Sequence, residues 1–169
     1  GALDIIAENI SDNAKYRKQI KRTCYLEGMI TTKATKPEEK SSYDMYYEFS
    51  EKVNRIPSHR ILAINRGEKE EFLKVKIDKP EEKILASIEK DIIKDEHSQY
   101  TELLKNCIAD SFSRLIEPSI DREIRADLTE KADEQAIKVF GKNAKQLLLA
   151  SPIKGKTVIG FDPAYRTGC

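Results

Sequence analysis

The apolar positions in the last third of the chain follow a helical period. Between Ser119 and Leu149 an apolar residue recurs at every fourth position without interruption. Four residues overshoot one helical turn of 3.6 residues, so each step turns the apolar stripe by about 40° around the helix axis. We therefore expect one continuous helix, about 45 Å long at 1.5 Å per residue, that packs against several neighbours in succession. The stripe consists of Ile120, Ile124, Leu128, Ala132, Ala136, Phe140, Ala144 and Leu148.

Helical periods also cover most of the preceding chain. Gly28 and Gly67 stand where two of the predicted helices end, because glycine is a common helix stop. Pro118 is expected to break one helix and to start the long one. The tyrosine-rich stretch that ends at Val53 is predicted to be helical as well. The predicted helices are 2–10, 13–27, 43–53, 57–67, 81–94, 100–116 and 119–149.

Two short stretches favour extended structure. Met29 to Thr35 is expected to be extended, and Leu73, Val75 and Ile77 alternate with lysines in the two-residue period of a strand. The expected fold class is therefore mainly α. It is a multi-helical array with a long C-terminal helix, one short strand, and a terminal strand near the end of the chain.

The composition is that of a charge-rich protein in a reducing compartment. Charged residues make up 35% of the 169 residues, hydrophobic residues 39%, and the formal net charge is +1. So small a net charge gives no overall attraction to nucleic acid. The three cysteines are far apart without metal-ligand spacing, which favours a cytoplasmic location and predicts no metal and no cofactor. The longest aliphatic run near the end, 147–150, is far short of a membrane span.

The best single candidate for chemistry stands near the end of the chain. An apolar run follows Thr157 and ends at Asp162-Pro163, which is typical of a strand followed by a turn. A carboxylate at the tip of a first strand is where nuclease and phosphotransfer folds hold a metal or a phosphate. Because a strand needs neighbours to satisfy its backbone, we expect this chain to be a piece of a larger protein in which a second domain begins here.

The terminal stretch GKTVIGFDPAYRTGC (155–169) and three upstream segments carry a family resemblance. The upstream segments are GALDIIAE (1–8), IPSHRILAINRGEKE (56–70), and ADEQA (132–136) leading into Phe140 and QLLL (146–149). The terminal stretch resembles the start of the YqgF (RNase H-like) domain in the Tex family of bacterial transcription accessory proteins. Ala164 stands where the family usually has glycine, and its methyl group hinders close approach to a phosphate.

The resemblance implies a domain organisation and a function. Residues 1–156 would be the helical central region of a Tex-like protein, and 157–169 the first strand of a YqgF domain. The protein would be a cytoplasmic, nucleic-acid-binding transcription accessory protein with RNA or DNA as a ligand. Its partners would include the transcription or translation machinery, and this segment would be a non-catalytic scaffold for the nucleic-acid-binding modules.

Positive charge gathers in one early block. Residues 13–36 carry seven bases against one acid, and clustered cations can neutralise phosphates. A solvated helix face is the alternative, because charge runs usually serve that role. Arg60 and Arg66, in the same predicted helix as His59, allow the same two interpretations, ligand binding or internal salt bridges. The weak nucleic-acid-binding candidates are Lys15, Lys18, Lys21, Arg22, Arg60 and Arg66.

Catalysis is not expected of this chain. Two-metal phosphodiester hydrolysis needs several carboxylates around ions roughly 4 Å apart, and Asp162 has no downstream partner. We interpret it as a vestigial carboxylate, assign no catalytic residue, and treat its strand-ending turn as the simpler explanation. Two alternatives stay open: the helical part of an RNase H-like nuclease or resolvase whose active site begins at Asp162, or a protein-binding helical module.

Overall fold

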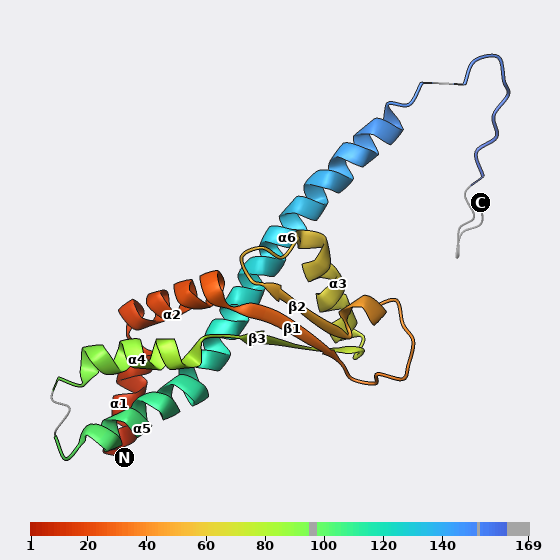
Figure 1. Ribbon diagram of the computed structural model, residues 1–169. Coiled ribbons are helices and arrows are strands. Elements are labelled where there is room, and N and C mark those ends of the chain that lie inside the picture. The colour runs from red at the N-terminus through yellow and green to blue at the C-terminus, as the bar shows by residue number, and fades with distance from the viewer. Residues whose placement is uncertain (95–97, 152, 162–169) are drawn as a thin grey trace. The chain divides into compact units, whose positions relative to one another are not determined.

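The structure is a computed structural model that describes residues 1–94, 98–151 and 153–161. The chain divides into two units, residues 1–136 and 137–169. The fold is mainly α with one small sheet, which confirms the predicted class, and Figure 1 shows the elements. They are α1 (Ala2–Ser11), α2 (Ala14–Glu27), β1 (Met29–Ala34), η1 (Asp44–Tyr46), β2 (Glu48–Lys52), α3 (Ser58–Lys69), β3 (Leu73–Asp78), α4 (Glu81–Ile92), α5 (Thr101–Asp110), η2 (Ser111–Ile116) and α6 (Glu117–Leu148).

The sheet has three antiparallel strands in the order β2-β1-β3. Thr31 in the central strand lies opposite Ser50 of β2 and Lys76 of β3. Alternate residues of β1, Ile30 and Thr32, are buried, because successive side chains of a strand point to opposite faces. One face of the sheet therefore contributes to the core and the other is left polar.

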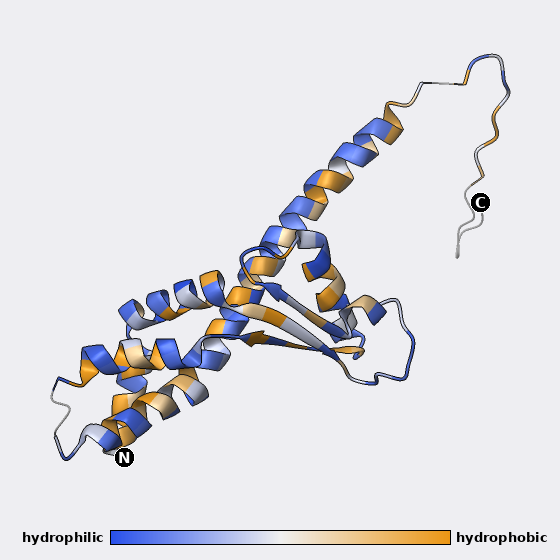
Figure 2. Cartoon of the chain, in the orientation of Figure 1, coloured by the Kyte–Doolittle hydropathy of each residue, from blue (hydrophilic) through white to orange (hydrophobic). Residues whose placement is uncertain are grey.

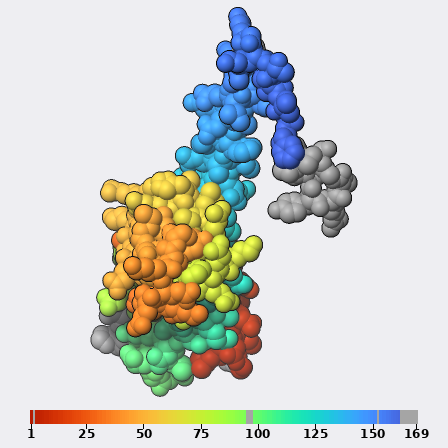
Figure 3. Space-filling view, turned by 90° about the vertical axis from the view of Figure 1, so that its right-hand side faces the viewer, coloured from red at the N-terminus to blue at the C-terminus, as the bar shows by residue number. Residues whose placement is uncertain are grey.

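The stretch 43–53 is not the predicted helix. It forms the short 3-10 helix η1 and then β2, which pairs with β1 along its length. Burial in β2 alternates, with Phe49 and Glu51 half-buried between exposed neighbours. The Phe49 ring also packs edge-on against Tyr46 at 5.3 Å between centroids. Pairing with β1 therefore outweighs the spacing of the aromatic residues, on which the helix prediction was based. In the space-filling view of Figure 3, the orange segment around 35–50 forms much of the visible face beside α3 in yellow.

α6 confirms the predicted long helix. It is continuous from Glu117 to Leu148. The first four stripe residues are buried in the core of unit 1–136, while Phe140 and Leu148 are 73% and 84% exposed. Figure 2 shows hydrophobic positions recurring along the whole helix, including its exposed part. The buried residues of the stripe are Ile120, Ile124, Leu128 and Ala132.

Pro118 does not break the helix, contrary to the sequence prediction. The preceding turns, η2, are π-helical, and the Glu117 backbone N–H donates to the Phe112 carbonyl five residues earlier. In a regular α-helix the proline ring would clash with the carbonyl of Arg114. The wider π-turn relieves that clash, so the chain passes from α5 into α6 without a loop.

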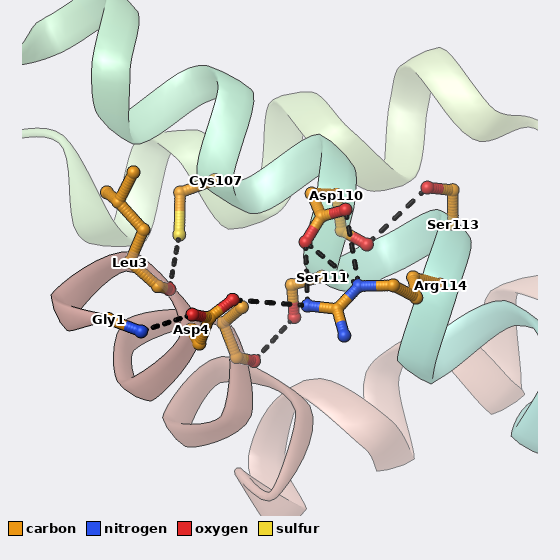
Figure 4. Close-up of polar contacts among 9 residues, drawn as sticks. Gly1, Leu3, Asp4, Cys107, Asp110, Ser111, Ser113 and Arg114 are labelled. Atoms are coloured by element: carbon orange, nitrogen blue, oxygen red, sulfur yellow. Dashed lines mark hydrogen bonds and ion pairs between the residues drawn. The ribbon is translucent and has the colours of Figure 1, made fainter.

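The π-helical turn also holds α1 in place. The buried Ser111 hydroxyl donates to the Ala7 carbonyl of α1 at 2.7 Å. On the exposed side of the same turn, an Arg114 guanidinium nitrogen lies 3.9 Å from an Asp4 carboxylate oxygen. Figure 4 shows both contacts between α1 and the helix that faces it. α1 and the π-helical turn η2 are therefore joined by polar contacts as well as by packing.

The expected terminal strand is not present over residues 157–161, which have no regular secondary structure. A strand needs a neighbouring backbone to pair with, and no described residue pairs with this segment. Asp162 and the residues after it lie outside the described part of the chain. The assignment of 157–169 to an RNase H-like domain stays a prediction.

A glycine pair tests the packing at the start of the sheet. A Cβ on Gly28 would lie 2.3 Å from the Cys24 carbonyl oxygen, whereas nothing lies within 4 Å of one on Gly141. We expect Gly28→Ala to lower the free energy of unfolding by roughly 1–3 kcal/mol, as overpacking does. Gly141→Ala should instead stabilise its helix by up to about 1 kcal/mol. Urea titrations followed by circular dichroism measure both, and equal midpoints for the two variants would contradict this packing.

Candidate nucleic-acid interface

α2 carries four of the predicted cations, and its own packing sets where they point. The helix begins at Asn13, whose side-chain oxygen accepts a hydrogen bond from the Lys15 backbone N–H at 3.0 Å. Ile20 and Cys24 are buried, so their side of the helix packs into the core. The cations therefore occupy the flanks and the outer side of the helix.

Two basic residues of α2 turn toward α6 instead of outward. Lys21 Nζ lies 2.8 Å from Asp127 Oδ2 and 3.5 Å from Glu123 Oε2. The hydrogen bond that Lys21 donates to the Asp127 carboxylate raises the pKa of Lys21, because it stabilises the charged form. Arg17 binds Glu123 as well and donates to the Ser119 hydroxyl at 2.7 Å. Lys21 thus joins two helices of the fold, and its charge is already compensated.

The remaining cations of α2 differ in their partners. Lys15 Nζ lies 2.7 Å from Asp91 Oδ2 of α4, and this hydrogen bond raises the pKa of Lys15. Lys18 and Arg22 are exposed. Neither forms an ion pair with any residue that the structure describes. Of the four predicted cations of α2, these two remain available to an external anion.

α3 separates its two predicted arginines in the same way. Arg60 lies 2.7 Å from Glu51 Oε2 of β2, and its guanidinium carbon lies 5.5 Å from the centre of the Phe49 ring. It therefore fastens α3 to the sheet. Arg66 is exposed, and so is His59. The structure leaves Arg66 available and shows an internal role for Arg60.

Sequence reasoning missed the outward face of the sheet. Its lysines come from all three strands and are all exposed. The alternation of Lys74 and Lys76 with apolar residues was visible in the sequence. The pairing of β3 with β1, and of β1 with β2, was not visible, because strand pairing joins distant segments. The lysines are Lys33, Lys52, Lys74 and Lys76.

One lysine is buried and structural. Lys79, whose side chain is 4% exposed, lies 2.9 Å from Glu117 Oε1 and 2.5 Å from Asp121 Oδ1. Burial disfavours its charge, but the hydrogen bonds that its ammonium group donates to the two carboxylates outweigh burial and raise the pKa of Lys79. Burial likewise raises the pKa of Asp121. This cluster ties the end of β3 to the start of α6.

No described group of residues is arranged for catalysis by a metal or a thiolate. Among residues 1–94, 98–151 and 153–161, no three His, Cys, Asp or Glu side chains lie together as metal ligands do. Burial raises the pKa of Cys24 to about 11 and also raises that of Cys107. Both are therefore neutral thiols at pH 7. In the same part of the chain, no helix has the length and apolar character needed to cross a membrane.

The fold and its surfaces define a helical module with cations on several faces, and comparison with known proteins identifies its family. A family model described as Tex central region-like matches residues 1–140. The Bacillus subtilis protein named Uncharacterized protein YdcI is 51% identical over 172 residues, covering 100% of this chain and 24% of that protein. The chain belongs to the Tex family.

Other relatives are more distant and carry descriptive names. S1 RNA-binding domain-containing protein 1 of Homo sapiens is 36% identical over 156 residues, covering 83% of this chain and 15% of that protein. Transcriptional accessory protein Tex of Neisseria gonorrhoeae is 32% identical over 181 residues, covering 99% of this chain and 23% of that protein. The chain thus spans a quarter or less of the length of these relatives.

The buried lysine gives a test with a defined pH dependence. Lys79→Met leaves Glu117 and Asp121, which are 28% and 25% exposed, without a counter-ion. We expect the free energy of unfolding to fall by about 3 kcal/mol at pH 7, the lower end of the range for breaking a buried pair. Without the ammonium group, the pKa of Asp121 in the folded state rises further above its unfolded value.

The sign of the pH effect follows from that rise. A carboxyl group with a raised folded pKa binds its proton more tightly in the folded state, so stability increases as the pH falls through the folded pKa. The deficit of Lys79→Met should therefore shrink between pH 7 and pH 5 in urea titrations. Lys83→Met is the control, since Lys83 pairs with Glu27 at the surface and should cost at most about 1 kcal/mol. A deficit that grows on acidification would contradict the assigned role of Lys79.

Proposed function

We propose that this chain is a non-catalytic scaffold segment of a nucleic-acid-associated Tex-family protein that acts in transcription in the cytoplasm. In this proposal residues 1–156 form the helical central region and 157–169 begin an RNase H-like domain. The relatives named above support the association, because one name refers to an RNA-binding domain and the other to transcription. RNA and DNA are both possible ligands in this proposal.

The observation that carries the scaffold role is the change of environment along α6. One continuous helix has its first apolar residues in the core and its later ones exposed. Ile137 and Phe140 are 70% and 73% exposed, although such residues are usually buried. A helix built in this way can hold one module through its first half and contact another through its second half. Positioning neighbouring parts of a longer protein is the function that this arrangement supports best.

The scaffold role can be tested in the natural full-length protein. We expect the double change Ile137→Ser and Phe140→Ser to increase limited proteolysis after α6 at least several-fold, because the second half of α6 loses the apolar side chains that would contact a neighbouring module. Lys138→Ser with Lys142→Ser changes exposed residues of the same turns and should leave the digestion pattern unchanged. Equal digestion of the wild type and the Ile137/Phe140 variant would argue against the scaffold role.

The nuclease alternative makes the opposite prediction about metal ions. We expect this chain to leave labelled DNA and RNA intact in magnesium or manganese, because a single candidate carboxylate cannot hold two metals. Gel analysis of labelled single and double strands provides the measurement. Metal-dependent cleavage that disappears in Asp162→Asn would favour the nuclease or resolvase alternative instead.

A further inference from the structure

We propose that the outward face of the three-stranded sheet binds the phosphate backbone of a nucleic acid through Lys33, Lys74 and Lys76. This inference rests on the proposed association with nucleic acid and assigns that association to a surface. It assigns the principal nucleic-acid contact to the sheet instead of to α2, because part of the positive charge of α2 is compensated within the fold.

The strand register brings the lysines together. Lys33 of the central strand lies directly opposite Lys74 of β3, and Thr31 lies opposite Lys76. Residues that face each other in this way have Cβ atoms about 5 Å apart. Lys74 and Lys76 point to the same face about 6.8 Å apart along their strand. Three ammonium groups from two strands thus share one side of the sheet.

This face is open, and the other face is packed. The inward residues Leu73 and Ile77 are buried, whereas Lys74 and Lys76 are exposed, and β1 shows the same division. The inward residues Leu73 and Ile77 belong to one core cluster with buried residues of α3 and α6. The lysines therefore lie on the exposed face of a sheet whose other face is packed.

The charge on this face is not balanced. Its nine outward positions include four lysines against two acids, Glu48 and Asp78. Lys76 Nζ lies 3.8 Å from Asp78 Oδ1 at the surface, and Glu48 lies across from Lys33 on β2. Neither Lys33 nor Lys74 forms an ion pair with any residue that the structure describes. Like charges directly opposite on a sheet cost stability, and a bound anion would remove that cost.

The character of the face points to a phosphate backbone. The neutral residues among its outward positions, Met29, Thr31 and Ser50, include two hydroxyls but no aromatic ring on which a base could stack. Lysines and hydroxyls bind phosphate oxygens without reading sequence. Binding should therefore be sensitive to salt and independent of sequence.

The test replaces the three lysines together. We expect the triple variant Lys33→Gln, Lys74→Gln, Lys76→Gln of this chain to bind labelled nucleic acid about tenfold more weakly or worse at 50 mM salt. The slope of log K against log salt should fall by about two to three, at 0.7–0.9 per phosphate contact. The same change should weaken binding by the natural full-length protein. The melting temperature of the triple variant should not fall, because the change also removes the like-charge pair of Lys33 and Lys74.

A matched variant controls for overall charge. Lys131→Gln, Lys138→Gln and Lys142→Gln remove the same charge from exposed positions of α6 and should leave affinity within about twofold. An equal loss in this control, or a loss confined to Lys18→Gln with Arg22→Gln, would overturn the sheet assignment while leaving the proposed function intact. Displacement by poly-glutamate as effective as by nucleic acid would identify an acidic protein instead. Absence of nucleic-acid binding by the natural full-length protein would refute the proposed function itself.

Discussion

The buried stripe on the first half of α6 is the contact on which the rest of the structure depends. Ile120, Ile124 and Leu128 belong to the same core cluster as the inward residues of the sheet and of α2, α3 and α4. Polar contacts flank this stripe, since α6 binds α2 through Glu123, α3 through Arg125, and the end of β3 through Asp121. A shift of the helix by one residue would displace the apolar and the ionic contacts together, so the stripe and its flanking charges specify one register.

The same arrangement compensates many charges of this charge-rich chain by ion pairs within the fold. Acids on α6 compensate basic residues of α2 and of the β3–α4 junction, so part of the positive charge of the sequence block 13–36 is neutralised within the fold. Arg60 likewise forms an ion pair with Glu51. Sheet geometry has the opposite effect, because alternation sends Lys74 and Lys76 outward together while apolar residues fill the core. Secondary structure therefore decides which charges remain for a partner.

Local patterns predicted the parts of the fold that depend on local contacts. The helical periods gave α2, α4 and the full extent of α6, and the alternation from Leu73 to Ile77 gave β3. β2 was not predicted because it is stabilised by pairing with β1, which its own sequence pattern does not show. The continuous helix through Pro118 was not predicted because a π-turn has no simple sequence period. Among the predicted cations, the sequence could not distinguish Lys21, which forms ion pairs with α6, from Lys18, which forms none with the described residues. The outward lysines of the sheet required the register of three distant segments.

The exposed half of α6 raises a further question of stability. Helices in water gain most of their stability from packing, and starting one is costly while extending it costs little. Residues 137–148 bury little apolar surface, yet they continue a helix whose earlier turns are fixed by Ile120 and Ile124. The packed half therefore acts as the nucleus from which the exposed half extends. Because extension adds one hydrogen bond per residue, the exposed turns need little packing of their own to remain helical.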